Sequence, residues 1–205
     1  MTARTVETPT HGRFLHEARD PERLLAGFHG YAENAELHLA ELAQIPGAET
    51  WSLAAVQALH PFYTRSEQVV ANWMTRLDRE LAIADNIEYV RRVLAMLPAP
   101  RTLVLLGFSQ GAAMAARSAA YAASAQGLIL LGGDIPPELQ SDDSIRWPPT
   151  LLARGVRDDW YTSEKLHADA TFLASRTRVV RCVFDGGHEW TAQFRAAAGE
   201  FLTTL

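Results

Sequence analysis

The residue with the clearest chemical context in the sequence is Ser109, in the segment Gly107-Phe108-Ser109-Gln110-Gly111. An apolar run over Arg101–Leu106 predicts a buried strand before this segment, and an alanine-rich stretch predicts a helix after it. A serine on a sharp strand-to-helix turn projects its hydroxyl from the sheet, and glycines two positions away on either side avoid collisions with neighbouring backbone. The pattern predicts a nucleophilic serine; the alternative is an ordinary glycine-rich turn.

A nucleophilic serine needs a histidine base and an acid that orients the histidine, and after this type of turn both follow the serine along the chain. Only His167 and His188 follow Ser109. His167 lies in a predicted surface helix. His188 follows the last predicted strand, directly after Gly186-Gly187, at the carboxyl edge where catalytic groups of parallel sheets gather. We therefore expect His188 to be the base.

The orienting acid is an aspartate in one of the loops after Ser109. The candidates are Asp134, Asp158, Asp159 and Asp185. Asp158 and Asp159 both follow the strand that ends at Arg154, and Asp134 follows the preceding strand. Asp185 is only three residues before His188 on the same turn, so it is badly placed to orient that ring. Spacing favours Asp158, then Asp134, then Asp159.

The oxyanion of an acyl-transfer reaction is held by backbone N–H groups. One donor is expected to be the N–H of Gln110, at the start of the helix after Ser109. The second is expected from the loop after an early strand, where the sequence GFHGYAENAE over 27–36 contains a His-Gly turn that would aim the N–H of Tyr31 at the serine. His29 precedes Ser109, so we interpret it as a structural histidine of this turn.

Aromatic residues occur in several segments that are expected to surround Ser109. They are Phe62, Tyr63, Trp73, Trp160 and Trp190. Trp160 and Trp190 each stand two residues after an expected catalytic residue, which favours them most. These rings could line a pocket for an acyl or aromatic group. The alternative is that they fill the core or close loops over the sheet.

Short apolar runs alternate with amphipathic stretches, which predicts a mostly parallel sheet covered by helices on both faces. Strands are expected at Thr5–Glu17 (one or two), Arg23–Gly30, Thr50–Leu59, Arg101–Leu106, Gly127–Leu131, Thr150–Arg154 and Arg178–Phe184. Helices are expected at Ala35–Ile45, Ile83–Leu97, Gln110–Ala123, Thr162–Ser175 and Thr191–Leu202. His60–Ala82 is predicted to be a loop with a short helix, and Gly132–Pro149 a turn-rich loop. No linker composition divides the chain, so residues 1–205 are expected to form a single domain.

The composition argues against several classes of partner. Of the 205 residues 48% are hydrophobic and 21% charged, as in soluble globular proteins, and the net charge of −5 argues against nucleic-acid binding. No run approaches the roughly 20 apolar residues of a membrane span. The single cysteine, Cys182, and an N-terminus without a signal-peptide core suit a cytoplasmic protein. The acidic turn Ser141–Ser144 has too few ligands for calcium, and no metal is expected.

Four segments occur in an order that resembles the phospholipase/carboxylesterase family of α/β-hydrolases, which includes bacterial carboxylesterases and acyl-protein thioesterases. They are HGYAENAE, GFSQGAAMAARSA, RGVRDDWY and GGHEW. The resemblance implies an α/β-hydrolase fold, a three-layer sandwich with a mostly parallel central sheet and no large cap domain. It implies Ser109 as nucleophile, Asp158 as acid, His188 as base and no cofactor. The chain departs from the family at Tyr31-Ala32-Glu33, where a glycine-rich stretch is common.

The expected activity is hydrolysis of small carboxylic esters through an acyl-serine, by a protein that is a monomer or homodimer. One alternative is a thioesterase or lysophospholipase that uses the same three residues. An alternative of another class is a non-catalytic binding module that kept the fold.

Overall fold

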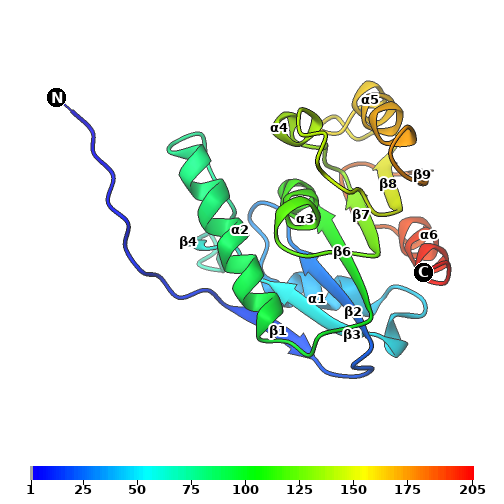
Figure 1. The fold of residues 1–205 in the computed structure, drawn as a ribbon, viewed down its shortest axis with the longest axis horizontal. Coiled ribbons are helices and arrows are strands. Elements are labelled where there is room, and N and C mark those ends of the chain that lie inside the picture. The colour runs from blue at the N-terminus through cyan, green and yellow to red at the C-terminus, as the bar shows by residue number, and fades with distance from the viewer. Residues whose placement is uncertain (1) are drawn as a thin grey trace.

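The computed structural model describes residues 2–205 (Figure 1). The strands are β1 (Phe14–Glu17), β2 (Arg23–Phe28), β3 (Ser52–Val56), β4 (His60–Tyr63), β5 (Val69–Asn72), β6 (Thr102–Phe108), β7 (Gly127–Leu131), β8 (Thr150–Gly155) and β9 (Val179–Phe184). The helices are α1 (Ala35–Ala43), α2 (Arg79–Ala95), α3 (Gln110–Tyr121), α4 (Pro137–Gln140), α5 (Ser163–Ala174) and α6 (Ala192–Leu202), with a 3-10 turn at Ala48–Thr50. Seven strands form one sheet in the order β1-β3-β2-β6-β7-β8-β9, and β4 and β5 form a separate pair. Within the large sheet β1 pairs antiparallel with β3, whereas the other pairs are parallel.

The large sheet is the middle of three layers. Successive residues of β6 point to opposite faces, so that Leu103 and Leu105 join one hydrophobic cluster, and Val104 and Leu106 join the other. Helices α2, α3 and α5 contribute buried side chains to the first cluster, and α1 and α6 to the second. Because both faces are covered, the central strands are apolar throughout, as the sequence analysis expected.

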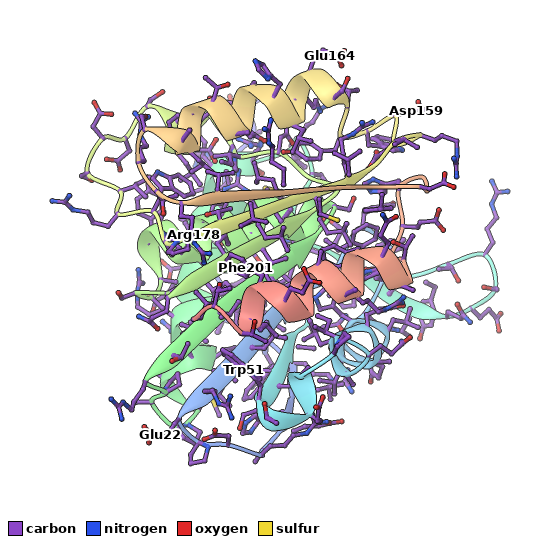
Figure 2. All side chains as sticks on the ribbon, turned by 90° about the vertical axis from the view of Figure 1, so that its right-hand side faces the viewer. Glu22, Trp51, Asp159, Glu164, Arg178 and Phe201 are labelled. Carbon is purple, nitrogen blue, oxygen red and sulfur yellow. The ribbon has the colours of Figure 1, made fainter. Side chains whose placement is uncertain are left out.

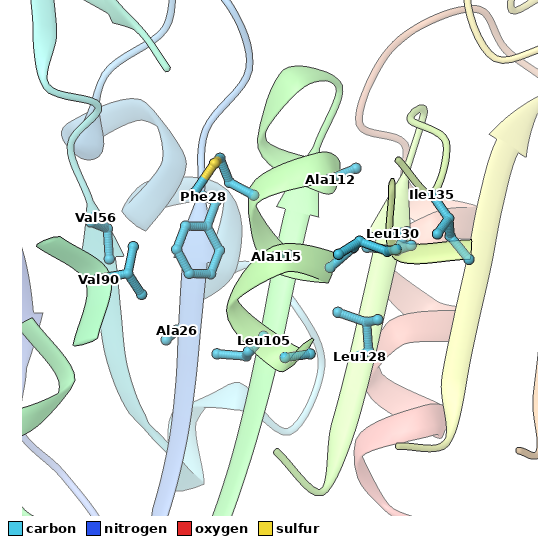
Figure 3. Close-up of a cluster of buried hydrophobic side chains, with 14 of the residues drawn as sticks. Ala26, Phe28, Val56, Val90, Leu105, Ala112, Ala115, Leu128, Leu130 and Ile135 are labelled. Carbon is cyan, nitrogen blue, oxygen red and sulfur yellow. The ribbon is translucent and has the colours of Figure 1, made fainter. Parts of the chain in front are cut away.

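Helix α3 lies close to the sheet because it presents small side chains to it. Ala112 and Ala115 are fully buried, and Figure 3 shows them near Leu105, Leu128 and Leu130 of the strands. A long side chain at either alanine would push the helix outward. The close packing fixes the start of α3 immediately after the end of β6.

The segment from His60 onward differs from the prediction of a loop with a short helix. It contains the β4–β5 hairpin, in which Phe62 pairs with Val70. The turn closes through the Thr64 N–H, which donates to the Gln68 carbonyl at 2.9 Å. Pro61 and the polar turn mask the strands in the sequence, whereas the buried Val70 gives the hairpin a core-facing side.

Two smaller differences concern the ends of elements. The first strand covers only Phe14–Glu17, and the exposed residues before it extend away from the sheet (Figure 1). The stretch predicted as a turn-rich loop, Gly132–Pro149, contains the short helix α4. Its Pro137 occupies the first helical position, where a missing N–H costs nothing.

Three helices begin at side chains that cap them. At the start of α1 the Asn34 side chain accepts a hydrogen bond from the N–H of Leu37. At the starts of α5 and α6 the side chains of Thr162 and Thr191 each accept from the N–H three residues further on. Among the helices within residues 2–205, none is both long and apolar enough to cross a membrane.

Because β2, β3 and β6 to β9 are parallel, they all begin at one edge of the sheet and end at the other. Glu22, Trp51 and Arg178 directly precede β2, β3 and β9, whereas Asp159 follows β8. Figure 2 shows Asp159 at the opposite end of the molecule from Glu22 and Trp51. The loops predicted to carry chemistry therefore leave one edge of the sheet together.

A substitution at Gly199 in α6 tests how tightly this helix packs on the face of the sheet that α1 and α6 cover. A Cβ at this position would lie 2.5 Å from the Pro46 carbonyl oxygen. We expect Gly199→Ala to lower the free energy of unfolding by about 1–3 kcal/mol, although alanine favours helix by about 1 kcal/mol. Urea unfolding measures it. Ala196→Gly, on the exposed side of α6, is the control and should cost only the propensity difference. A Gly199→Ala protein as stable as the wild type would contradict this account.

Candidate active site

Ser109 occupies a strained turn between β6 and α3. Its φ of 54° and ψ of −119° lie in a region that L-residues rarely adopt. The Ser109 N–H donates to the Leu131 carbonyl at 2.8 Å, which ties the turn to the end of β7. A Cβ at Gly107 would overlap the Gly111 backbone, and one at Gly111 would overlap the Phe28 carbonyl. Both glycines of the motif are therefore required by close backbone approaches.

Three side chains predicted from the sequence form a continuous hydrogen-bonded chain. His188 Nε2 lies 2.7 Å from Ser109 Oγ, and His188 Nδ1 lies 2.9 Å from Asp158 Oδ2. The Asp158 side chain is 1% exposed and that of His188 is 23% exposed. A carboxylate only accepts hydrogen bonds, so Nδ1 carries the proton and Nε2 is left to accept from the serine hydroxyl.

Asp158 is held by the loop that follows β8. Its Oδ1 accepts hydrogen bonds from the N–H groups of Trp160 and Tyr161, both at 2.9 Å. The buried Arg154 donates to the carbonyls of Tyr161 at 2.7 Å and of Asp158 at 3.1 Å. Oδ2 is left to face His188. Sequence reasoning missed Arg154, although an arginine at the end of an apolar strand is a signal for a buried polar role.

The Asp158 loop rests on a second buried network. Tyr161 donates its hydroxyl to Asp169 at 3.0 Å, and the Ile135 N–H donates to the same carboxyl oxygen at 3.2 Å. Burial raises the pKa of Asp169 to about 6 and also raises the pKa of Tyr161. These groups connect the Asp158 loop to α5 and to the segment after β7.

The competing residues lie elsewhere. Asp134 forms an ion pair with Lys165 at 3.5 Å, and Asp185 pairs with Arg157. Asp159 is exposed, as is His167 on α5. The structure brings none of them to His188 in the way it brings Asp158.

Three further glycines, which no sequence motif singles out, allow the loops to meet. Gly132 has a φ of 64°, and a Cβ there would lie 3.0 Å from the His188 ring. A Cβ at Gly133 would overlap the Ser109 carbonyl, and one at Gly155 would overlap the backbone of Gly186-Gly187. Side chains at these positions would hold the histidine and the serine apart.

The loop after β2 lies against the serine. A Cβ on Gly30 would lie 3.3 Å from the Cβ of Ser109. Within residues 2–205 no hydrogen bond uses the N–H of Tyr31 or that of Gln110. Two backbone donors near the serine are thus free to bind an oxygen atom.

His29 is a structural residue of this loop. Its ring is fully buried, its Nε2 accepts from the Ala58 N–H at 3.0 Å, and its Nδ1 lies 2.7 Å from the Gly30 carbonyl. Burial lowers the pKa of His29, which favours the neutral ring that this pattern needs. This matches the interpretation from the sequence.

Of the five aromatic residues expected around the site, Phe62, Tyr63, Trp160 and Trp190 are exposed or half-buried, whereas Trp73 is fully buried. Tyr31 stacks on Phe62 with ring centroids 5.5 Å apart, and the exposed Trp160 lies 6.4 Å from the His188 ring. Tyr63 is 73% exposed. Trp190 is half-buried and packs 6.0 Å from the Phe108 ring.

Trp73 differs from the expectation that it lines a pocket. It is fully buried, packs on Phe28 and donates its indole N–H to the His29 carbonyl at 2.9 Å. The Gln110 side chain accepts a hydrogen bond from the backbone N–H of Trp73. Trp73 therefore packs against the loop after β2 from the protein interior.

Neither a family model nor a curated protein matches the chain. Solved structures do match over nearly its whole length. Esterase PE8 is 20% identical with a TM-score of 0.73, covering 94% of this chain and 97% of that one. The Bacillus cereus carboxylesterase is 15% identical with a TM-score of 0.74, covering 94% of each chain. The chain has the α/β-hydrolase fold.

The Zea mays acyl-protein thioesterase 2 has the same fold. It is 18% identical with a TM-score of 0.68, covering 95% of this chain and 99% of that one. The predicted fold class, including a mostly parallel central sheet, is therefore confirmed.

Arg154 provides a test of how the Asp158 loop is held. Arg154→Ala removes a buried cation that binds backbone carbonyls, so we expect a loss of about 2–4 kcal/mol in the free energy of unfolding. Chemical denaturation measures it. Arg157→Ala in the same loop is the matched control, because its exposed pair with Asp185 contributes less than about 1 kcal/mol. Equal effects of the two substitutions would rule out the role given to Arg154.

Proposed function

We propose that this α/β-hydrolase is a serine hydrolase that cleaves small carboxylic esters through an acyl-serine intermediate. The observation that carries the proposal is the chain of contacts from Ser109 through His188 to Asp158, at 2.7 and 2.9 Å. Similarity to proteins named as an esterase and a carboxylesterase supports the same reaction class. The short contact between Ser109 and His188 argues against the alternative of a non-catalytic binding module.

The reaction follows from the placement of these groups. Ser109 Oγ attacks the ester carbonyl while His188 Nε2 takes its proton. The carbonyl oxygen becomes an oxyanion, which accepts hydrogen bonds from the N–H groups of Tyr31 and Gln110. The intermediate collapses as His188 donates the proton to the leaving alcohol, and the acyl group remains on the serine.

Water completes the cycle. His188 removes a proton from a water molecule, which attacks the acyl-serine carbonyl. When the second intermediate collapses, His188 returns that proton to Ser109 Oγ, and a carboxylic acid leaves. Asp158 holds the imidazole in the required tautomer and stabilises its positive charge during both halves. The route moves protons only among groups of this chain, its substrate and water, so the proposal includes no cofactor or metal.

The aromatic rings around the serine are proposed to contact the substrate. The candidates are Tyr31 stacked on Phe62, Trp160 beside His188 and Trp190 beside Phe108, together with the exposed Tyr63. A thioesterase or lysophospholipase would use the same serine and differ in the leaving group. Values of kcat/KM on ester, thioester and lysolipid substrates with one acyl group distinguish these cases. Single-domain organisation, a monomeric or homodimeric state and a cytoplasmic location stay predictions.

Ser109 is tested by covalent labelling. A fluorophosphonate should add its mass to the peptide that contains Ser109, and Ser109→Ala should abolish labelling and lower kcat on p-nitrophenyl acetate by at least about 10³-fold. Mass spectrometry and steady-state kinetics measure these effects. Ser118→Ala, which removes a buried hydroxyl elsewhere on α3, should leave both unchanged. Undiminished turnover by Ser109→Ala would refute the proposed function.

Asp158 has a separate test. Asp158→Asn should lower kcat by about 10⁴-fold, as for the equivalent change in a serine protease, because the amide no longer favours the tautomer with a proton on Nδ1. Asp159→Asn and Asp134→Asn should leave kcat within about threefold of the wild type, as neither contacts His188. A larger effect of either control would move the orienting role to that aspartate.

A further inference from the structure

Glu33 lies at the end of the loop that presents the Tyr31 N–H, and the mechanism above gives it no role. Its side chain turns back along the loop, where Oε2 accepts a hydrogen bond from the Gly30 N–H at 2.7 Å. Its own N–H donates to the Gly30 carbonyl at 3.3 Å. Glu33 therefore binds both the N–H and the carbonyl of Gly30.

The Gly30–Tyr31 peptide is oriented by its carbonyl group. That carbonyl accepts from the Glu33 N–H and from His29 Nδ1, which carries the proton because Nε2 accepts from Ala58. The C=O and N–H of a trans peptide point in opposite directions. With the carbonyl held on one side, the Tyr31 N–H points the other way and has no partner among the described residues.

The β4–β5 hairpin anchors the far side of the loop. The Ala32 N–H donates to the Ala71 carbonyl at 3.1 Å, and the Ala71 N–H donates to the Glu33 carbonyl at 2.8 Å. Ala32 has a φ of 59°, an uncommon conformation for alanine that these bonds maintain. The Gly30 N–H is the other backbone group of the loop that is held in place. Within residues 2–205 its only hydrogen-bond acceptor is the Glu33 side chain.

Glu33 is close enough to the reacting groups for its position to matter. A Cβ at Gly30 would lie 3.2 Å from Glu33 Oε2 and 3.3 Å from the Ser109 Cβ. Burial raises the pKa of the Glu33 carboxyl, the hydrogen bond from Gly30 opposes the shift, and His188 opposes it more weakly. Gly30 is itself buried, so its N–H would lack a partner if the carboxyl oxygen were removed.

We infer that Glu33 is a positioning residue for the proposed hydrolysis: its carboxyl oxygen fixes the Gly30 N–H, and this keeps the Tyr31 N–H aimed at the oxyanion. The inference rests on the proposed function. Glu33 acts through the loop and does not touch the substrate. What it supplies is an acceptor oxygen at one place, so its charge is not the feature that matters.

Three substitutions separate the acceptor from the charge. Glu33→Gln keeps an acceptor oxygen at the same reach and removes the charge. Glu33→Asp keeps the charge but is one methylene shorter and falls short of the Gly30 N–H. Glu33→Ala removes both. Glu36→Gln, an exposed acid three residues further on, is the matched control.

The experiment measures kcat and KM on p-nitrophenyl acetate, with active sites counted by end-point fluorophosphonate labelling. Counting active sites excludes losses caused by unfolding. We expect Glu33→Ala and Glu33→Asp to lower kcat per active site by about 10- to 100-fold with KM within about threefold, because a misdirected oxyanion donor costs transition-state stabilisation. Glu33→Gln and Glu36→Gln should stay within about threefold of the wild type.

Two outcomes would overturn the inference. One is a Glu33→Asp enzyme with wild-type kcat per active site, since the Tyr31 N–H would then be positioned without the hydrogen bond from Gly30 to residue 33. The other is a Glu33→Gln enzyme as impaired as Glu33→Asp, since an acceptor oxygen at the right reach would then not be sufficient. A wild-type protein that neither labels at Ser109 nor turns over the ester would instead refute the proposed function.

Discussion

The positive φ of Ser109 depends on three close approaches between backbone groups, each of which requires a glycine. Gly111 meets the carbonyl that ends β2, Gly133 meets the carbonyl of Ser109 itself, and Gly107 meets the first turn of α3. Side chains at these points would force the segments apart and release the turn. The ends of β2 and β6, the segment after β7 and the start of α3 therefore touch through backbone atoms. The exposure of the serine hydroxyl depends on these contacts.

The hydrogen-bonded chain from the serine is assembled from distant parts of the sequence. His188 is 79 residues from Ser109 and 30 from Asp158. No local interaction brings such residues together, so the parallel order of β6, β7, β8 and β9 does. The sheet delivers the loops to one edge, and buried groups such as Arg154 and Asp169 then set the direction of each side chain within its loop.

Most of the sheet and the three side chains of the hydrogen-bonded chain could be predicted from the sequence because they leave short-range signals. The strand around Leu105 is apolar on both faces, and Ser109 stands between glycines at fixed spacing. The β4–β5 hairpin is not evident from the sequence because Pro61 and a polar turn mask its two strands, which pair with each other only in the folded chain. Trp73 was placed at a pocket because an aromatic residue in a loop-like segment carries no signal of depth. The roles of Arg154 and Glu33 depend on which backbone groups lie near them, and only the three-dimensional structure provides that.

The hairpin pairs with the loop after β2 through both backbone bonds of Ala71, while its own tip stays exposed. The chain can therefore be lengthened between Thr64 and Gln68 without moving Ala71, because the anchoring strand residues are upstream and downstream of the turn. Added residues there would grow from the side where Phe62 stacks on Tyr31. The tip is consequently a place where insertions could change the surface beside Tyr31 while the contacts among Ser109, His188 and Asp158 stay as they are.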